Sequence, residues 1–182
     1  MITSKDMEEL YGRENLVTVP RSDIERFRLR PQDAEVLTEV GLPRVSSPYF
    51  TVQLEGGPKF LTVIDVTTRS GKDHREVIIG GPPGDRGMRF SVDAHEGFIT
   101  LAQLRGTRPR GEVVNNNLSE FIEFLYRIEQ HRVRTAQHPA DCEESLEELT
   151  NALMRIDPIS LEREDDWWSI ALHQLRGGGV GL

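Results

Sequence analysis

The hydrophobic residues of this chain change their spacing twice, and this change limits the folds that the chain can adopt. Between residues 49 and 104, β-branched and aromatic side chains follow the two-residue period of half-buried strands. On either side of this stretch, apolar residues recur three or four positions apart, as on one face of a helix. The pattern predicts an α+β fold, an antiparallel sheet of about five to six strands flanked by N-terminal and C-terminal helices.

The central stretch predicts an antiparallel meander of strands. Turn clusters separate its runs, which lie at residues 49–54, 59–66, 76–79, 88–92 and 97–104. The clearest hairpin joins the last two runs, and Gly97 can supply the positive φ that its loop needs. Another short strand is predicted at residues 16–19.

Three short helices are predicted before the sheet. One covers residues 4–10. A second begins at a capping box formed by Ser22 and Glu25 and is ended by Pro31. A third covers residues 32–40 and stops at Gly41, which can adopt the left-handed conformation that closes helices.

Three helices are predicted after the sheet. Asn117 has the features of an N-cap, with Glu120 three residues on and an amphipathic stripe behind it: Leu118, Phe121, Ile122, Leu125 and Ile128. The others cover residues 143–155 and 164–176, with Trp168 expected in the core and Trp167 nearer the surface. Residues 1–176 are expected to form one domain, and residues 177–182 a frayed glycine-rich tail.

Negative charge is concentrated in one segment. The chain has a net charge of −8, and residues 140–166 contain ten acids and two bases, so the other 155 residues sum to zero. This balance argues against nucleic acid as the main partner. The segment fits either a basic protein partner or a well-solvated face.

Motifs for catalysis or metal binding are weak. The glycine-rich run at residues 80–87 joins two predicted strands and lacks the lysine of a phosphate loop, so it predicts a wide turn. The five histidines match no zinc spacing, and acidic neighbours disfavour a Cys142 thiolate. No catalytic residue, metal or cofactor is predicted. Asn115–Asn117 fit either amides that contact a partner or a cap preceded by turn residues.

The features that the sequence lacks indicate the cellular compartment of the protein. The N-terminus has no secretory signal pattern, and no apolar run is long enough for a membrane span. A lone cysteine cannot form an internal disulfide. A cytoplasmic protein without membrane contact is therefore expected.

Four segments in order resemble the fourth family of the SUKH superfamily, bacterial immunity proteins that neutralise polymorphic toxins. They are LTEVGLPRVSSPYF (37–50), VDAHEGFITL (92–101), VNNNLSEFIEFLYRIE (114–129) and IDPISLEREDDWWSIALHQL (156–175). The resemblance implies a non-enzymatic protein that binds a cognate toxin encoded by a neighbouring gene. Asn115–Asn117 stand where the family often has Asn-Ser-Ser.

The charge pattern and the resemblance together suggest a toxin-binding surface. A toxin that acts on nucleic acid tends to be basic, so an acidic surface would complement it. The residues expected to contribute are Asp141, Glu143, Glu144, Glu147, Glu148, Glu164, Asp165, Asp166 and the aromatic Trp167. A scaffold or regulatory module of the same fold is the alternative, and an enzyme that uses the turn at residues 80–87 is a third possibility.

Overall fold

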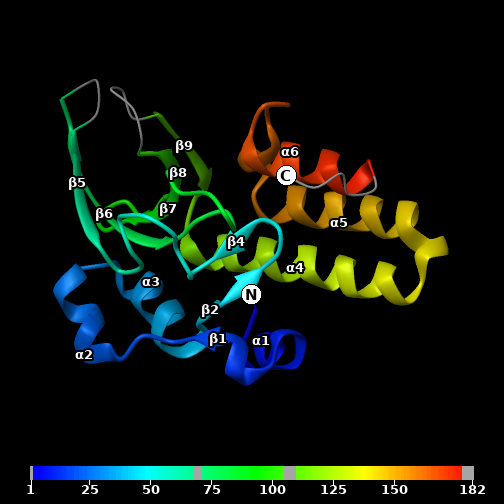
Figure 1. Cartoon of the computed structure of the whole chain (residues 1–182), viewed down its shortest axis with the longest axis horizontal. Helices are drawn as coiled ribbons and strands as arrows, with labels where there is room; N and C mark the ends of the chain where they lie inside the picture. Colours follow the sequence, from blue (N-terminus) through cyan, green and yellow to red (C-terminus); the bar gives the residue numbers. More distant parts are fainter. Residues whose placement is uncertain (1, 68–70, 105–109, 178–182) are drawn as a thin grey trace.

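The computed structural model describes residues 2–67, 71–104 and 110–177, and the chain falls into three successive parts (Figure 1). Short helices come first, a five-stranded sheet follows, and three longer helices come last. Figure 1 shows the sheet at the upper left, the longer helices to its right and the short helices below. This arrangement confirms the predicted α+β class. Most of the predicted tail, residues 178–182, lies outside the described residues.

The sheet is an antiparallel meander in which each strand pairs with the next one along the chain. Its strands are β5 (Val63–Thr67), β6 (Asp73–Gly80), β7 (Met88–Asp93), β8 (Ile99–Gln103) and β9 (Arg110–Asn115). The predicted hairpin is confirmed, because Val92 pairs with Ile99 and Gly97 has a φ of 80°. The turn at residues 80–87 joins β6 to β7, as predicted.

The run at residues 49–54 does not belong to this sheet, which corrects the predicted meander. Only β4 (Phe50–Thr51) forms there, and it pairs with β3 (Val45–Ser46). The Phe50 ring lies so close to Gly80 that an added Cβ would be 2.2 Å from it, so the segment crosses the end of β6. The fifth strand is instead β9, which the sequence analysis missed because only Val113 and Val114 interrupt its polar residues.

The N-terminal helices differ from the prediction at their ends. After α1 (Ser4–Tyr11), α2 (Arg21–Ile24) begins directly behind Pro20, so Ser22 lies inside the first turn and caps nothing. The helical segment ends at Phe27 because Arg28 is left-handed, and Pro31 instead begins α3 (Pro31–Glu35). Gly41 closes the following π-helical turn, Val36–Val40, as predicted. The short strand β1 (Leu16–Val17) pairs with β2 (Leu42–Pro43).

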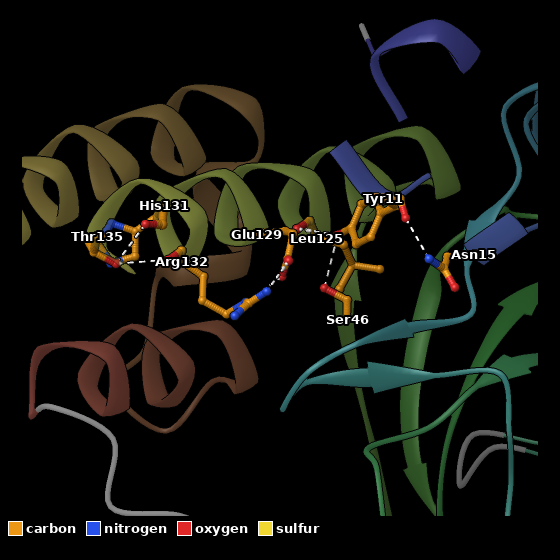
Figure 2. Close-up of polar contacts among 8 residues, drawn as sticks. All are labelled: Tyr11, Asn15, Ser46, Leu125, Glu129, His131, Arg132 and Thr135. Atoms are coloured by element: carbon orange, nitrogen blue, oxygen red, sulfur yellow. Dashed lines mark hydrogen bonds and ion pairs between the residues drawn. The ribbon is translucent and has the colours of Figure 1, made fainter. Parts of the chain in front are cut away.

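The first helix is tied to the long helix α4 (Leu118–Gln137) through one tyrosine (Figure 2). The Tyr11 hydroxyl donates to the Leu125 carbonyl at 3.0 Å and lies 3.1 Å from Ser46 Oγ. Burial raises the pKa of Tyr11. One turn further along α4, the Arg132 guanidinium binds the Glu129 carboxylate at 3.0 and 2.6 Å. Tyr11 therefore joins α1, β3 and α4.

Aromatic side chains fill the space between the sheet and the C-terminal helices. The predicted α4 stripe is buried, and Asn117 accepts a hydrogen bond from the Glu120 N–H at 2.9 Å, which confirms the cap. Phe121 packs against Phe90 at 5.2 Å and Trp168 at 5.8 Å between ring centroids. The other two helices are α5 (Cys142–Ile156), which buries Leu146, Leu149 and Leu153, and α6 (Trp167–Arg176), which begins three residues later than predicted.

A buried carboxylate joins the end of β9 to the last helices. Asp157 accepts hydrogen bonds from Asn115 Nδ2 at 3.2 Å, from Asn116 Nδ2 at 2.8 Å and from Ser160 Oγ at 2.5 Å. Asn115 Oδ1 in turn accepts one from the Trp168 indole at 2.9 Å. Asn116 lies in the bend before α4, as the turn interpretation predicts, whereas Asn115 ends β9. Both amides bond to Asp157 inside the molecule.

Replacing Asp157 by asparagine is expected to destabilise the fold. The new side-chain amide would place an N–H group against the donors that now bond to the carboxylate. Buried donors left without an acceptor lower the free energy of unfolding by about 2–4 kcal/mol in total. Urea unfolding of Asp157→Asn measures this loss. Asp165→Asn, at an exposed position, is the control and should leave the midpoint unchanged. An Asp157→Asn variant as stable as the parent would show that the hydrogen bonds of Asp157 do not stabilise the fold.

Candidate functional site

Four of the predicted partner-binding acids lie on the exposed side of α5. Glu143, Glu144, Glu147 and Glu148 are all exposed, because they alternate around the helix with the buried stripe of Leu146, Leu149 and Leu153. We call these four glutamates the acidic face. Asp141, at the N-cap of α5, is partly buried and its side chain caps no N–H.

The acidic face is divided between the two flanks of α5. Glu143 and Glu147 border a hollow of about 410 Å³ that Arg176 of α6 also lines. Glu148 instead reaches toward α4, where Arg134 Nη1 lies 2.6 Å from its carboxylate. Within the described chain, Glu143, Glu144 and Glu147 have no ion-pair partner. These three therefore carry the uncompensated charge of the face.

The remaining acids form a separate group before α6. Glu164 is exposed, Asp165 binds the Arg163 guanidinium at 3.0 and 2.9 Å, and Asp166 accepts the Arg163 N–H at 2.8 Å. This group follows the end of α5, whereas Glu143 lies at its start. A helix of 15 residues is about 20 Å long, so the structure does not gather the acids into one cluster.

Trp167 is half-buried between the sheet and α6. Its ring meets the Phe90 ring edge-on at 5.7 Å, and its backbone N–H donates to Glu112 Oε1 at 3.1 Å. Trp168 is fully buried, as predicted. Burial raises the pKa of Glu112, and the nearby Asp166 and Asp165 carboxylates add to the rise. Only part of the Trp167 indole is therefore accessible to a partner.

One of the five histidines, His131, is used internally. His131 on α4 is buried, and its Nδ1 lies 2.8 Å from Ser145 Oγ on α5. Burial lowers the pKa of His131. Among the residues that the structure describes, no group of three His, Cys, Asp or Glu side chains is placed to hold a metal ion.

The outer face of the sheet contains a hollow that the sequence analysis missed. Side chains alternate along each strand, so Phe90 and Val92 face the helices while Ser91 and Asp93 face outward. The hollow has a volume of about 780 Å³, and its apolar walls include Ile64, Val66, Phe98, Ala102 and Val113. We call it the sheet hollow.

Two carboxylates lie at the polar centre of the sheet hollow. Glu76 on β6 and Asp93 on β7 are directly opposite in the register, and both are buried. Ser91 Oγ donates to Glu76 Oε2, and His74 Nδ1 lies 2.5 Å from Asp93 Oδ2. Asp93 Oδ1 also accepts the His95 and Glu96 N–H groups at 2.8 Å each.

The two carboxylates have opposite pKa shifts. Burial raises the pKa of Glu76, and the neighbouring Asp93 charge adds to this rise despite the Ser91 hydrogen bond. Burial also acts to raise the pKa of Asp93. There, however, the Glu96 N–H, the His74 ring and the His95 N–H together bring the pKa below its ordinary value. The two pKa shifts differ in direction because the charged form of Asp93 accepts more hydrogen bonds than that of Glu76.

The polar centre is not arranged as a hydrolase triad. In such a triad the serine hydroxyl is bonded to the histidine that will accept its proton. Here Ser91 is bonded to Glu76, while His74 is bonded to Asp93. Alternating polar residues inside β6 and β7 were a signal for this cluster, because His74, Glu76, Ser91 and Asp93 occupy every second position of strands whose other face is core.

Comparisons with known proteins give one match. The family model described as SUKH-4 immunity protein matches residues 2–174 of the chain. Neither the curated proteins nor the solved structures include a match to this chain. In the described part of the chain, no helix has the length and apolar character needed to cross a membrane.

The opposite shifts of Glu76 and Asp93 predict opposite effects of pH on two amide variants. A carboxyl group whose pKa is lower in the folded chain than in the unfolded chain stabilises the fold at pH values above the unfolded pKa. This stabilisation is lost as the pH falls through the folded pKa. A carboxyl group whose pKa is raised in the folded chain makes folding less favourable as the pH rises. Asp93→Asn should therefore lose most stability near pH 7 and less in acid. Glu76→Gln should gain stability, relative to the parent, between pH 4 and pH 7.

Chemical denaturation of the parent and both variants across this pH range measures the effect. The two stability differences should change with pH in opposite directions. Parallel pH profiles for the two variants would contradict the assigned shifts.

Proposed function

The chain belongs to the SUKH-4 immunity protein family, and we propose that it neutralises a cognate toxin in the cytosol by binding it directly, without catalysing a reaction. Membership confirms the resemblance of its sequence and implies toxin neutralisation as the role. The match over residues 2–174 is the observation that carries the proposal. Ser91 is bonded to Glu76 and His74 to Asp93, so the two side chains do not form the Ser–His pair of a hydrolase, which supports a binding role.

We assign the acidic face to the toxin contact. Glu143, Glu144 and Glu147 are exposed and form no ion pair within the described chain, which favours steering of a basic partner. Toxins that act on nucleic acid must bind phosphates and so present lysine and arginine. The proposed partner is such a basic toxin, encoded next to this chain. In this proposal Asp141, Glu148, Glu164, Asp165, Asp166 and the exposed part of Trp167 extend the contact.

Co-expression tests the proposed role. The chain is expressed together with the product of the adjacent reading frame, and growth and co-purification are scored. Rescue of growth with a stable complex is expected. If the adjacent product is toxic and neither rescue nor a complex is found, immunity is rejected and a scaffold role with the same fold is favoured.

Charge reversal tests the acidic face. The triple variant Glu143→Lys, Glu144→Lys, Glu147→Lys should slow association with the toxin by at least about tenfold at low salt, because it removes the steering field. The affinity should also become less dependent on salt concentration. Stopped-flow association at several salt concentrations measures both.

A control with the same change in net charge separates local from global effects. Glu8→Lys, Glu35→Lys, Glu39→Lys changes three exposed acids on the N-terminal helices. Its association rate should stay near that of the parent. Equal slowing by both triples would assign the effect to net charge and remove the acidic face from the contact.

A further inference from the structure

The sheet hollow has a charge that its own walls do not balance. Four carboxylates, those of Asp65, Glu76, Asp93 and Glu112, are among its lining residues, and no lysine or arginine is among those that the structure describes. His74 is the one basic side chain there, so the hollow is negative whether or not this ring is protonated. Asp65 is itself exposed and lies 3.3 Å from Arg75, which leaves Glu76 and Asp93 as the buried charges.

The buried pair is unfavourable in the free chain. Like charges directly opposite on neighbouring strands repel each other, and both groups have lost most of their water. A cation placed over the pair would remove the repulsion and replace the lost solvation. Among the described residues only His74 can supply a positive charge there, and it lies on the Asp93 side, so Glu76 forms no ion pair of its own.

One acceptor in the hollow is free for a ligand. Asp93 already accepts bonds from His74, His95 and Glu96. Glu76 accepts only from Ser91, through Oε2. Its other oxygen, Oε1, has no hydrogen-bond partner among the described residues. Glu76 can therefore bond a donor directly, while Asp93 contributes charge.

The walls suit the apolar stem and flat head of an arginine. Phe98 and Val113 are 38% and 56% exposed, so both offer apolar surface to a ligand in the hollow. Aromatic rings stack on guanidinium groups, which are weakly hydrated, and apolar walls cover the methylene stem. Arginine is also enriched at the energetic centres of protein interfaces.

We propose that the sheet hollow receives an arginine side chain of the toxin, with its guanidinium bonded to Glu76 Oε1 beside Asp93 and its stem against Phe98 and Val113. This inference rests on the proposed function, since the arginine belongs to the toxin. It makes the hollow the point of specific recognition, while the acidic face acts mainly on the rate of encounter.

The hollow can be tested without the toxin. The full chain, labelled with ¹⁵N, is titrated with n-butylguanidinium, and n-butylammonium and neutral valeramide are titrated in parallel. Saturable shifts are expected at the amides of Glu76, Ser91 and Thr100 with the guanidinium, weaker ones with the ammonium and none with valeramide. Equal shifts from all three compounds, or no saturable shift from the guanidinium, would overturn the proposal. Stronger binding of the ammonium would replace arginine by lysine as the occupant and also overturn it.

Two variants test the hollow in the complex. Glu76→Gln removes the charge with little change in shape, and Val113→Lys places a cation at the exposed rim. Each should weaken toxin binding by at least about tenfold. Val45→Lys is the matched control, because Val45 is an exposed valine on β3, outside the hollow, and it should bind as the parent does. Circular dichroism melts verify that all three variants are folded.

The outcomes separate this inference from the proposed function. If the parent chain neither rescues growth nor binds the adjacent product, the proposed function fails. If the parent rescues growth and both hollow variants bind as tightly as Val45→Lys, only the arginine proposal fails.

Discussion

The buried carboxylate of Asp157 is the constraint on which the rest of the structure depends. It accepts hydrogen bonds from the end of β9, from the bend before α4 and from the turn before α6, and Asn115 in turn bonds Trp168. The helices are thereby held on one face of the sheet, where the Phe90, Phe121 and Trp168 rings meet. Because all three longer helices lie on that side of the sheet, they leave the hollow on the outer face uncovered.

The two negatively charged surfaces differ in their physical character. The glutamates of the acidic face are solvated, so they act at a distance and are screened by salt. Glu76 and Asp93 have lost most of their water, so they act on a group that enters the sheet hollow. Exposed charges mainly set association rates, whereas desolvated charges discriminate between partners. An immunity protein that must meet one toxin quickly and reject others would use both.

The sequence predicted those parts of the fold that local patterns determine. The α4 stripe, the Asn117 cap and the Gly97 hairpin depend on residues a few positions apart, and all three are confirmed. The strand β9 was missed because most of its residues are not apolar, although its partner β8 directly precedes it in the chain. The partners Asp157 and Ser160 of Asn115 lie more than 40 residues away, and no local pattern encodes such contacts. The sheet hollow was missed for a related reason: alternation marks two strand faces but does not show which one stays uncovered.

Hydrogen–deuterium exchange of the chain alone and bound to its toxin is the most direct test of recognition at the sheet hollow. Recognition at the sheet hollow and the acidic face should slow exchange on binding in β7 and β8 around Ser91 and Thr100 and at the start of α5. Protection confined to the N-terminal helices, with β7 and β8 unchanged, would place the toxin away from the sheet hollow and contradict this recognition.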